Sequence, residues 1–184
     1  MTRIPSLLLL IAMSVTAWAE PPAEGSAAPA FSLPDQTGEI HSLTDYQGSW
    51  LLLYFYPKDD TPGCTTEACQ FRDHITVLNA LGVKIVGISL DDEASHAAFA
   101  AKHELPFTLL ADSDGVVTER YDALRNLMVI KVAKRYSFLI NPQGVIAERY
   151  LDVDPDTHAS QVITDVKRLQ KLAGSEAEES AETN

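Results

Sequence analysis

The sequence predicts an α/β domain with a mixed central β-sheet flanked by helices and an amino-terminal β-hairpin. Runs rich in β-branched and aromatic residues alternate with segments whose apolar residues recur every three to four positions, as in strands joined by helices. Near the carboxyl-terminal end, two strand-like runs flank Pro142-Gln-Gly144, whose turn chemistry predicts an antiparallel hairpin. Strands joined by helices run parallel, so the predicted sheet is mixed.

The elements are expected in the order strand-strand, strand-helix-strand-helix, strand-strand-helix, with a short strand and a short helix before the last group. Strands are predicted at residues 31–33, 39–43, 50–56, 83–90, 107–110, 136–141 and 145–150. Helices are predicted at residues 64–81, 93–103 and 115–121, and from a cap at Asp156 or Thr157 to about Leu172. Residues 122–134 fit neither pattern, and we expect a loop that lies over the functional site.

The two ends of the chain differ in composition from the middle. Residues 1–19 have the pattern of a secretory signal peptide, with Arg3, an apolar stretch and the small-x-small site Ala17-Trp-Ala19. We therefore expect export and a periplasmic location after cleavage near Ala19, with an uncleaved membrane anchor as the alternative. Residues 20–29 are expected to form a flexible lead-in, residues 30–173 the domain, and residues 174–184 a disordered acidic tail.

Charge narrows the classes of partner and ligand. The chain has 14 Lys and Arg against 26 Asp and Glu, a formal net charge of −12. Such a surface argues against nucleic acid and anionic lipid, so we expect no nucleic-acid binding and no stable membrane association. We also expect no metal and no cofactor. A structural zinc site is not expected because Cys64, Cys69 and His74, five residues apart in turn, would point in three directions from one helix.

The only two cysteines, Cys64 and Cys69, lie where a predicted strand passes through a Pro/Gly-containing loop into a predicted helix. Free N–H groups at a helix start stabilise a thiolate, which is the reactive form of cysteine. Five residues of helix give a rise of ~7.5 Å and a rotation of ~140°. The two Cα atoms would then lie ~8.7 Å apart, beyond the ~7 Å limit for a disulfide. A bond between them would require the helix start to unwind, which favours a redox switch over a structural staple.

The residues around Cys64 resemble the peroxiredoxins. The signature Pro-x-x-x-Thr-x-x-Cys of that family matches Pro57, Thr61 and Cys64. The longer string Tyr-Pro-Lys-x-x-Thr-Pro-Gly-Cys-Thr-x-x-Ala-Cys is similar to the bacterioferritin-comigratory, or PrxQ, subfamily. The similarity extends from about Ala28 to Leu172 and includes residues 134–140, which are like the family's Arg-x-Ser/Thr-Phe-Leu-Ile strand. The resemblance implies a thioredoxin-like fold.

The resemblance also implies a role for each matched residue. Cys64 would be the peroxidatic nucleophile, which a hydroperoxide oxidises to sulfenic acid, and Cys69 the resolving thiol, which forms an intramolecular disulfide with it. Thr61 and Arg135 would bind the sulfur and the peroxide oxygen, and Pro57 would shield the intermediate from water. The implied enzyme is an antioxidant atypical 2-Cys peroxidase, recycled by a thioredoxin-like dithiol, and we expect a monomer.

Two other functions stay open at this point. A thiol:disulfide oxidoreductase acting on proteins would use the same two thiols, and a binding module would carry them only as a structural disulfide. We expect Asp59 and Asp60 to be solvated turn residues, because anions oppose a nearby thiolate. The remaining histidines are expected to be structural or solvated: His41, His96, His103 and His158.

Overall fold

Five strands form the central sheet, in the order β5-β4-β3-β8-β9. In this computed structural model, which describes residues 20–182, the predicted signal peptide at residues 1–19 lies outside the described residues. Strand β3 (Trp50–Phe55) pairs in parallel with β4 (Val83–Ser89) and in antiparallel with β8 (Ser137–Ile140). The outer strands are β5 (Thr108–Ala111), parallel to β4, and β9 (Ile146–Tyr150), antiparallel to β8. The predicted mixed sheet is confirmed.

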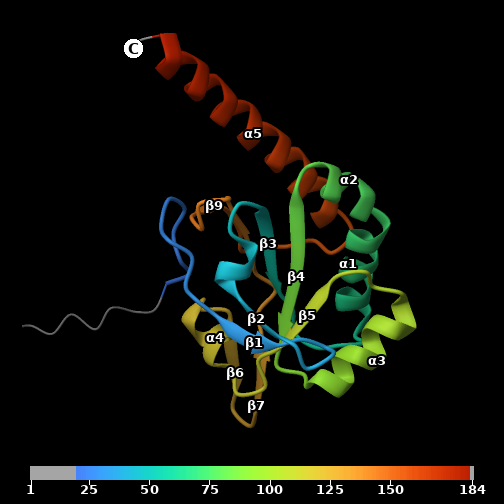
Figure 1. Cartoon of the computed structure of the whole chain (residues 1–184). Coiled ribbons are helices and arrows are strands. Elements are labelled where there is room, and N and C mark those ends of the chain that lie inside the picture. The colour runs from blue at the N-terminus through green and yellow to red at the C-terminus, as the bar shows by residue number, and fades with distance from the viewer. Residues whose placement is uncertain (1–19, 183–184) are drawn as a thin grey trace, which may run out of the picture.

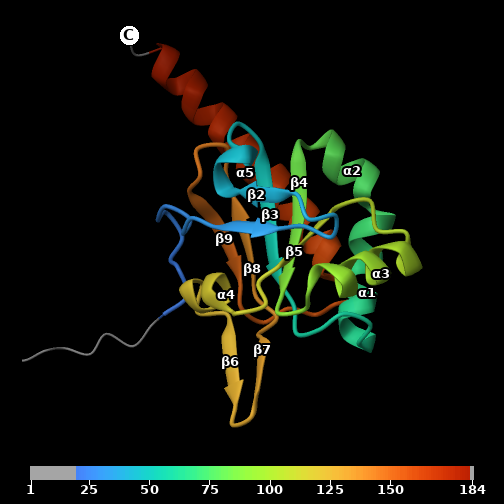
Figure 2. The same cartoon turned by 60° about the horizontal axis from the view of Figure 1, so that its bottom comes forward.

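The two faces of the sheet are covered by different elements (Figures 1 and 2). One face packs against α1 (Pro62–Asp73), α2 (Ile75–Ala80), α3 (Glu93–His103) and α5 (His158–Glu182). The other packs against the hairpin β1 (Ser32–Pro34)–β2 (Ile40–Ser42) and against α4 (Val116–Arg120). A 3₁₀ helix, η1 (Leu43–Tyr46), follows the hairpin. Successive side chains of β3 point to opposite faces, so this one strand supplies apolar side chains to both cores.

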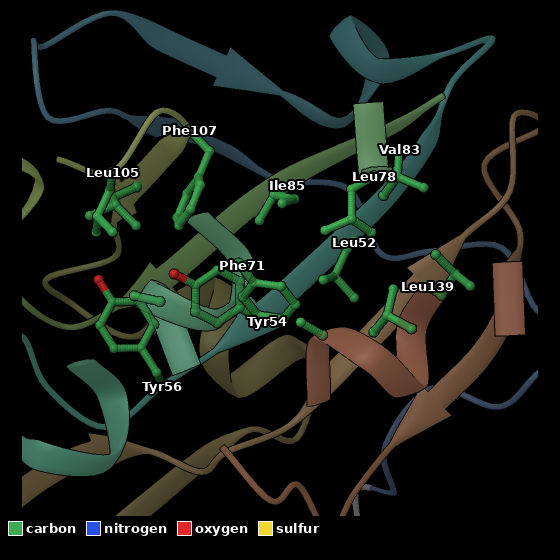
Figure 3. Close-up of a cluster of buried hydrophobic side chains, with 14 of the residues drawn as sticks. Leu52, Tyr54, Tyr56, Phe71, Leu78, Val83, Ile85, Leu105, Phe107 and Leu139 are labelled. Carbon is green, nitrogen blue, oxygen red and sulfur yellow. The ribbon is translucent and has the colours of Figure 1, made fainter. Parts of the chain in front are cut away.

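The core on the helical face holds α1 against the end of β3 (Figure 3). The ring of Tyr54 lies 5.3 Å from that of Tyr56 and 5.1 Å from that of Phe71 on α1, measured between centroids. Cys64 belongs to the same cluster. Truncation of a buried aromatic residue such as Phe71 costs about 3–5 kcal/mol, so this packing fixes the position of the helix that carries both cysteines.

The helix expected at residues 64–81 is divided into α1 and α2. The break occurs at His74, whose backbone angles of −100° and 5° leave the helical range. The imidazole Nδ1 of His74 lies 2.8 Å from the carbonyl oxygen of Gln70, so the ring shares the acceptor that the backbone N–H of His74 also uses. Such side-chain competition for a backbone carbonyl ends helices.

Residues 122–134 form a hairpin and not the loop that we expected. Its strands are β6 (Leu124–Leu127) and β7 (Ile130–Ala133), and Figure 2 shows it extending away from the central sheet. Most of its side chains are exposed. The hairpin therefore lacks the alternation of buried and exposed residues by which a strand is recognised in a sequence.

Both ends of the described chain also differ from our expectations. Backbone hydrogen bonds tie the lead-in to the start of β9, since Gly25 donates to Ile146 and Ala28 donates to Gly144 at 2.8 and 2.9 Å. Helix α5 continues to Glu182 and extends beyond the body of the domain (Figure 1), so residues 174–182 are helical and not a disordered tail. Ala and Glu, which dominate this stretch, are strong helix formers.

Within residues 20–182, no helix combines the length and the apolar character that crossing a bilayer requires.

Candidate active site

Cys64 is the third residue of α1. Pro62, which has no N–H, begins the helix, and the preceding Thr61 has extended backbone angles of −84° and 148°. Within the described chain, the backbone N–H groups of Gly63 and Cys64 have no hydrogen-bond partner. These free N–H groups point away from the helix at its N-terminus, where the helix dipole gives a partial positive charge. The side chain of Cys64 is buried, and neither cysteine is in a disulfide.

Arg135, which precedes β8, brings a permanent positive charge to Cys64. Its Nη2 lies 3.3 Å from the Sγ of Cys64, and its Nη1 donates to a carboxylate oxygen of Glu67. Burial alone would lower the pKa of Arg135, but the charges of Glu67 and Cys64 and their hydrogen bonds outweigh it and raise that pKa above its ordinary value. Arg135 is thus a cation at every accessible pH. The structure joins the two residues that the resemblance paired.

Glu67 connects Arg135 to His158. The side chains of Glu67 and His158 are both fully buried, and the Nδ1 of His158 lies 2.8 Å from the second carboxylate oxygen of Glu67. Glu67 was not among the residues expected at the site, and His158 was expected only to be structural or solvated. Glu67 follows Cys64 by three residues, a spacing that places both on one side of a helix. That spacing was the available sequence signal.

Tyr54 also lies close to this charged group. Burial, and after it the charges of Glu67 and Cys64, raise the pKa of Tyr54 well above its ordinary range. The Tyr54 hydroxyl is therefore neutral and does not serve as a base. It has no hydrogen-bond partner within the described residues.

Thr61 and Pro57 belong to the loop between β3 and α1. The Thr61 hydroxyl donates to the carbonyl oxygen of Lys58 at 2.9 Å, and no hydrogen bond joins it to Cys64. Pro57 and Arg135 line a groove of about 590 Å³, whose other walls come from the β6–β7 hairpin and the residues after it: Arg125, Val132, Ala133, Lys134 and Tyr136. Arg135 is therefore accessible to a small molecule through this groove.

A polar network fixes the loop that precedes Cys64. Asp59 is buried, which contradicts our expectation of a solvated residue, and its carboxylate accepts hydrogen bonds from the Tyr56 hydroxyl and the Ser95 hydroxyl, both at 2.8 Å. The Nδ1 of His96 lies 2.9 Å from the same carboxylate. Asp60 is exposed, as expected. The burial of Asp59 follows from these partners, which satisfy its oxygens; Ser95 and His96 come from a distant part of the chain.

Cys69 lies on the same helix as Cys64, and its side chain is half-buried. Helix α1 runs unbroken through both residues, which confirms the predicted helix at this position. Helical geometry then separates their Cα atoms by about 8.7 Å. A disulfide between them would require part of α1 to unwind.

The described residues contain one group that could hold a metal ion, and it lies on the β1–β2 hairpin. Ligand atoms of Asp35, Glu39 and His41 lie within 4.8 Å of one another. Asp35 is already engaged, because one of its oxygens accepts hydrogen bonds from the Thr37 N–H, the Thr37 hydroxyl and the Glu39 N–H. None of these residues contacts the cysteines, and our expectation of a metal-free protein stays a prediction.

An α/β sheet with a reduced thiol at a helix start, paired with a partly buried arginine, defines a thiol-based redox protein. The family model described as the AhpC/TSA family matches residues 25–149, more than half of the chain. The chain belongs to the AhpC/TSA family and, within it, to the peroxiredoxins of the Bcp/PrxQ type. It is thus a thiol peroxidase by family.

Several relatives support this assignment over most of the chain. The chain is 46% identical over 143 residues to a bcp peroxiredoxin candidate of Coxiella burnetii, covering 76% of this chain and 95% of that one. It is 42% identical over 147 residues to peroxiredoxin Bcp of Escherichia coli, covering 78% and 94%. A crystal structure of PrxQ from Xylella fastidiosa matches with a TM-score of 0.77 and 30% identity, covering 83% of this chain and 99% of that one. The match to this solved structure confirms the thioredoxin-like fold.

Proposed function

We propose that the protein reduces hydrogen peroxide and organic hydroperoxides, with the thiolate of Cys64 as the peroxidatic nucleophile. The observation that carries this proposal is the 3.3 Å contact between the Nη2 of Arg135 and the Sγ of Cys64 at the start of α1. A fixed cation and free N–H groups both attract a negatively charged sulfur. The same groups can hold the oxygens of a bound peroxide.

In the first step, the Cys64 thiolate attacks the terminal oxygen of the hydroperoxide along the O–O bond. The S–O bond forms as the O–O bond breaks, and the departing alkoxide or hydroxide takes up a proton and leaves as alcohol or water. Arg135 and the N–H groups of Gly63 and Cys64 stabilise the charge that develops on the oxygens. The Thr61 hydroxyl, which donates to Lys58, retains lone pairs that can accept the O–H of the peroxide. Pro57 limits the access of water.

Glu67 acts as a positioning residue in this scheme. It accepts from Arg135 and is itself held by His158, so the guanidinium is directed toward the sulfur. Hydrogen-bonded supporting residues of this kind commonly set the orientation of a functional group.

In the second step, the start of α1 unwinds and the Cys69 sulfur attacks the sulfur of the Cys64 sulfenic acid. A disulfide forms and water leaves, so the cycle is that of an atypical 2-Cys peroxidase. A dithiol reductant, of the thioredoxin-like kind, then exchanges with this disulfide and restores both thiols. If the two cysteines formed only a structural disulfide, the reduced protein would not need a continuous α1. In this structure α1 is continuous through both cysteines.

The test uses the two cysteine variants. Cys64→Ser should abolish peroxide consumption. Cys69→Ser should still be oxidised once to a sulfenic acid, which dimedone labels, but should not turn over with a dithiol. Full turnover by Cys64→Ser, or no dimedone adduct on Cys69→Ser, would contradict the proposal. Insulin reduction without peroxide consumption would instead assign a thiol:disulfide oxidoreductase, and a mere drop in Tm on reduction would assign a binding module.

We also propose that the protein is exported and works in the periplasm as a monomer. The support for export is the signal-peptide pattern of residues 1–19. Intact-mass analysis of the periplasmic fraction should find a chain that begins at Glu20, and sedimentation should give the mass of one chain. A full-length chain confined to the cytoplasmic fraction would contradict the proposed export.

A further inference from the structure

The tip of the β6–β7 hairpin is a cluster of exposed aliphatic side chains. Four consecutive residues have exposed fractions of 48%, 104%, 93% and 60%: Leu127, Met128, Val129 and Ile130. Elsewhere in the described chain, large exposed apolar residues occur singly, as at Val77. Clustered apolar exposure of this kind marks an interaction surface, whereas single exposed residues are ordinary.

The charge around this apolar tip is opposite to that of the protein. The chain has 26 Asp and Glu, yet residues 123–147 contain none of them and carry four of the 14 Lys and Arg. In the hairpin register, Arg125 pairs with Val132 and Lys131 pairs with Asn126, so the two cations lie on opposite faces just behind the tip. Neither is in an ion pair with another described residue, whereas Lys134 and Arg135 both are.

The turn itself is not one that hairpin formation would favour. Met128 has a φ of 53°, at a position where two-residue turns normally use Gly or Asn. A bulky side chain there costs conformational energy and adds nothing to the domain's own core, because Met128 is fully exposed. An external contact would explain why the tip is apolar.

We propose that this hairpin docks the protein on the surface of an anionic phospholipid bilayer. Residues 127–130 enter the interfacial region, and Arg125 and Lys131 lie at the level of the lipid phosphates. Aliphatic side chains flanked by unpaired cations are the combination that binds such surfaces. A protein partner is less favoured, since the tip has no aromatic residue and projects outward (Figure 2), whereas protein interfaces are rich in aromatic residues and poor in Lys.

The net charge of −12 limits how the protein can bind. Repulsion between the acidic body and the lipid is screened beyond about 8–10 Å at physiological salt. A hairpin that projects from the body can therefore contact the lipid while the acidic surface of the body remains farther from it than the screening distance. Binding is reversible and weakens with salt, which is compatible with the absence of stable membrane association expected from the sequence.

Docking would also place the groove beside Arg135 at the lipid surface. Arg125 and Val132 of the hairpin line that groove together with Pro57 and Arg135. Hydroperoxides carried by membrane lipids would then reach the site without leaving the interface. This consequence, unlike the docking itself, rests on the proposed function.

The test is co-sedimentation with vesicles of equal parts phosphatidylcholine and phosphatidylglycerol. The wild-type protein and a Met128→Gly/Val129→Asn variant are purified from the same exporting host, so that both have the same amino terminus. The variant has residues that suit a tight hairpin turn but lacks the apolar tip. Its partition coefficient should fall at least about tenfold, and that of Lys131→Gln about fivefold. Val77→Ser, which removes a single exposed apolar side chain on α2, should bind as the wild type does.

Three results would overturn the docking proposal. They are equal sedimentation of the wild type and the tip variant, equal binding to vesicles of phosphatidylcholine alone, and a lipid-free dimer that the tip variant dissociates. In the last case the tip would be the contact surface for a second copy of the chain.

A separate assay tests whether docking gives access to hydroperoxides of membrane lipids. The tip variant should reduce hydrogen peroxide in solution at the wild-type rate, but phospholipid hydroperoxide in the mixed vesicles more slowly. Failure of the wild type to consume hydrogen peroxide would count against the proposed function and leave the vesicle result unchanged.

Discussion

Glu67, which is buried, and Arg135, which is partly buried, form an ion pair whose guanidinium also reaches the sulfur of Cys64. Because a guanidinium is planar and rigid, the direction of its Nη1 toward Glu67 fixes the direction of its Nη2 toward Cys64. Burying the Glu67 charge has a desolvation cost, which its two hydrogen-bonded partners offset. The pair therefore sets geometry at the candidate nucleophile.

Glu67→Gln should lower kcat/KM for hydrogen peroxide by about tenfold, because the amide holds the guanidinium less firmly than the carboxylate does. Arg135→Lys should have a larger effect, about 10²–10³-fold, because an ammonium cannot contact the sulfur and the peroxide oxygens with a planar fork. The measurement is the rate of Cys64 oxidation in the stopped flow, well below the Tm of each variant. Unchanged oxidation rates together with a lowered Tm would show that the pair is only structural.

Gly63 offers a way to move Arg135 without removing a charge. A Cβ added at Gly63 would lie 3.1 Å from the Nη2 of Arg135, so the end of that side chain would have to shift by a few tenths of an ångström. Gly63→Ala should leave stability unchanged or raise it by up to about 1 kcal/mol, since Ala is the better helix former. Peroxide turnover should nevertheless fall severalfold.

The matched control for this substitution is Gly174→Ala in α5. No atom outside the helix backbone lies within 4 Å of the position of its Cβ, and the backbone there is helical. It should affect stability in the same direction and leave turnover unchanged. Equal turnover in the two variants would show that the 3.3 Å contact between Arg135 and Cys64 does not govern the rate.

The elements that the sequence predicts best are those whose signals are local. Helix α3 was expected at residues 93–103 and spans Glu93–His103, with the Asp92 side chain accepting from the Ser95 N–H as an N-cap. The β6–β7 hairpin could not be predicted in this way. Most of its side chains are exposed, so its strands are held mainly by cross-strand pairing, and its Met-Val turn lacks the usual hairpin residues.

The residues of the candidate site also differ in whether a local sequence signal identifies them. Cys64, Thr61 and Pro57 form a short motif, so the resemblance could identify them from the sequence. Glu67 and His158 are 91 residues apart, and only the packing of α1 against α5 brings them together. The burial of Asp59 likewise depends on a partner 37 residues away, His96. No local pattern contains these pairings.

Oxidation should unwind the start of α1 and leave the rest of the fold in place. If a disulfide forms between Cys64 and Cys69, the amides of residues 65–69 lose their helical hydrogen bonds, and their hydrogen exchange should accelerate by at least about tenfold. Helix α3, which contains no cysteine, should exchange at the same rate in both states. Peroxide-treated Cys69→Ser, which cannot form the bond, should exchange as the reduced protein does. Identical exchange of α1 in reduced and oxidised wild type would contradict the unwinding step.

Because of Asp91, the stability of the loop before Cys64 should depend on pH in the acidic range. Burial raises its pKa, but hydrogen bonds from the Asp59 N–H and the Ser89 hydroxyl, and the charge of Lys58, outweigh burial and hold the pKa below its ordinary 3.8. Because the folded protein binds this proton less tightly than the unfolded chain, the ionised carboxylate stabilises the fold above about pH 4. That contribution is lost as the pH falls through the folded value.

Asp91→Asn should therefore lower the free energy of unfolding by about 1–3 kcal/mol at pH 7. The difference from the wild type should shrink as the pH falls below about 4, where the wild-type carboxylate also becomes neutral. Urea unfolding at pH 7 and at pH 3 measures both values, and taking the difference removes the contribution of the other carboxyl groups. Asp73→Asn removes an exposed charge paired with Arg72, and should change stability little at either pH. An equal cost of Asp91→Asn at both values would mean that its hydrogen bonds, and not its charge, hold the loop.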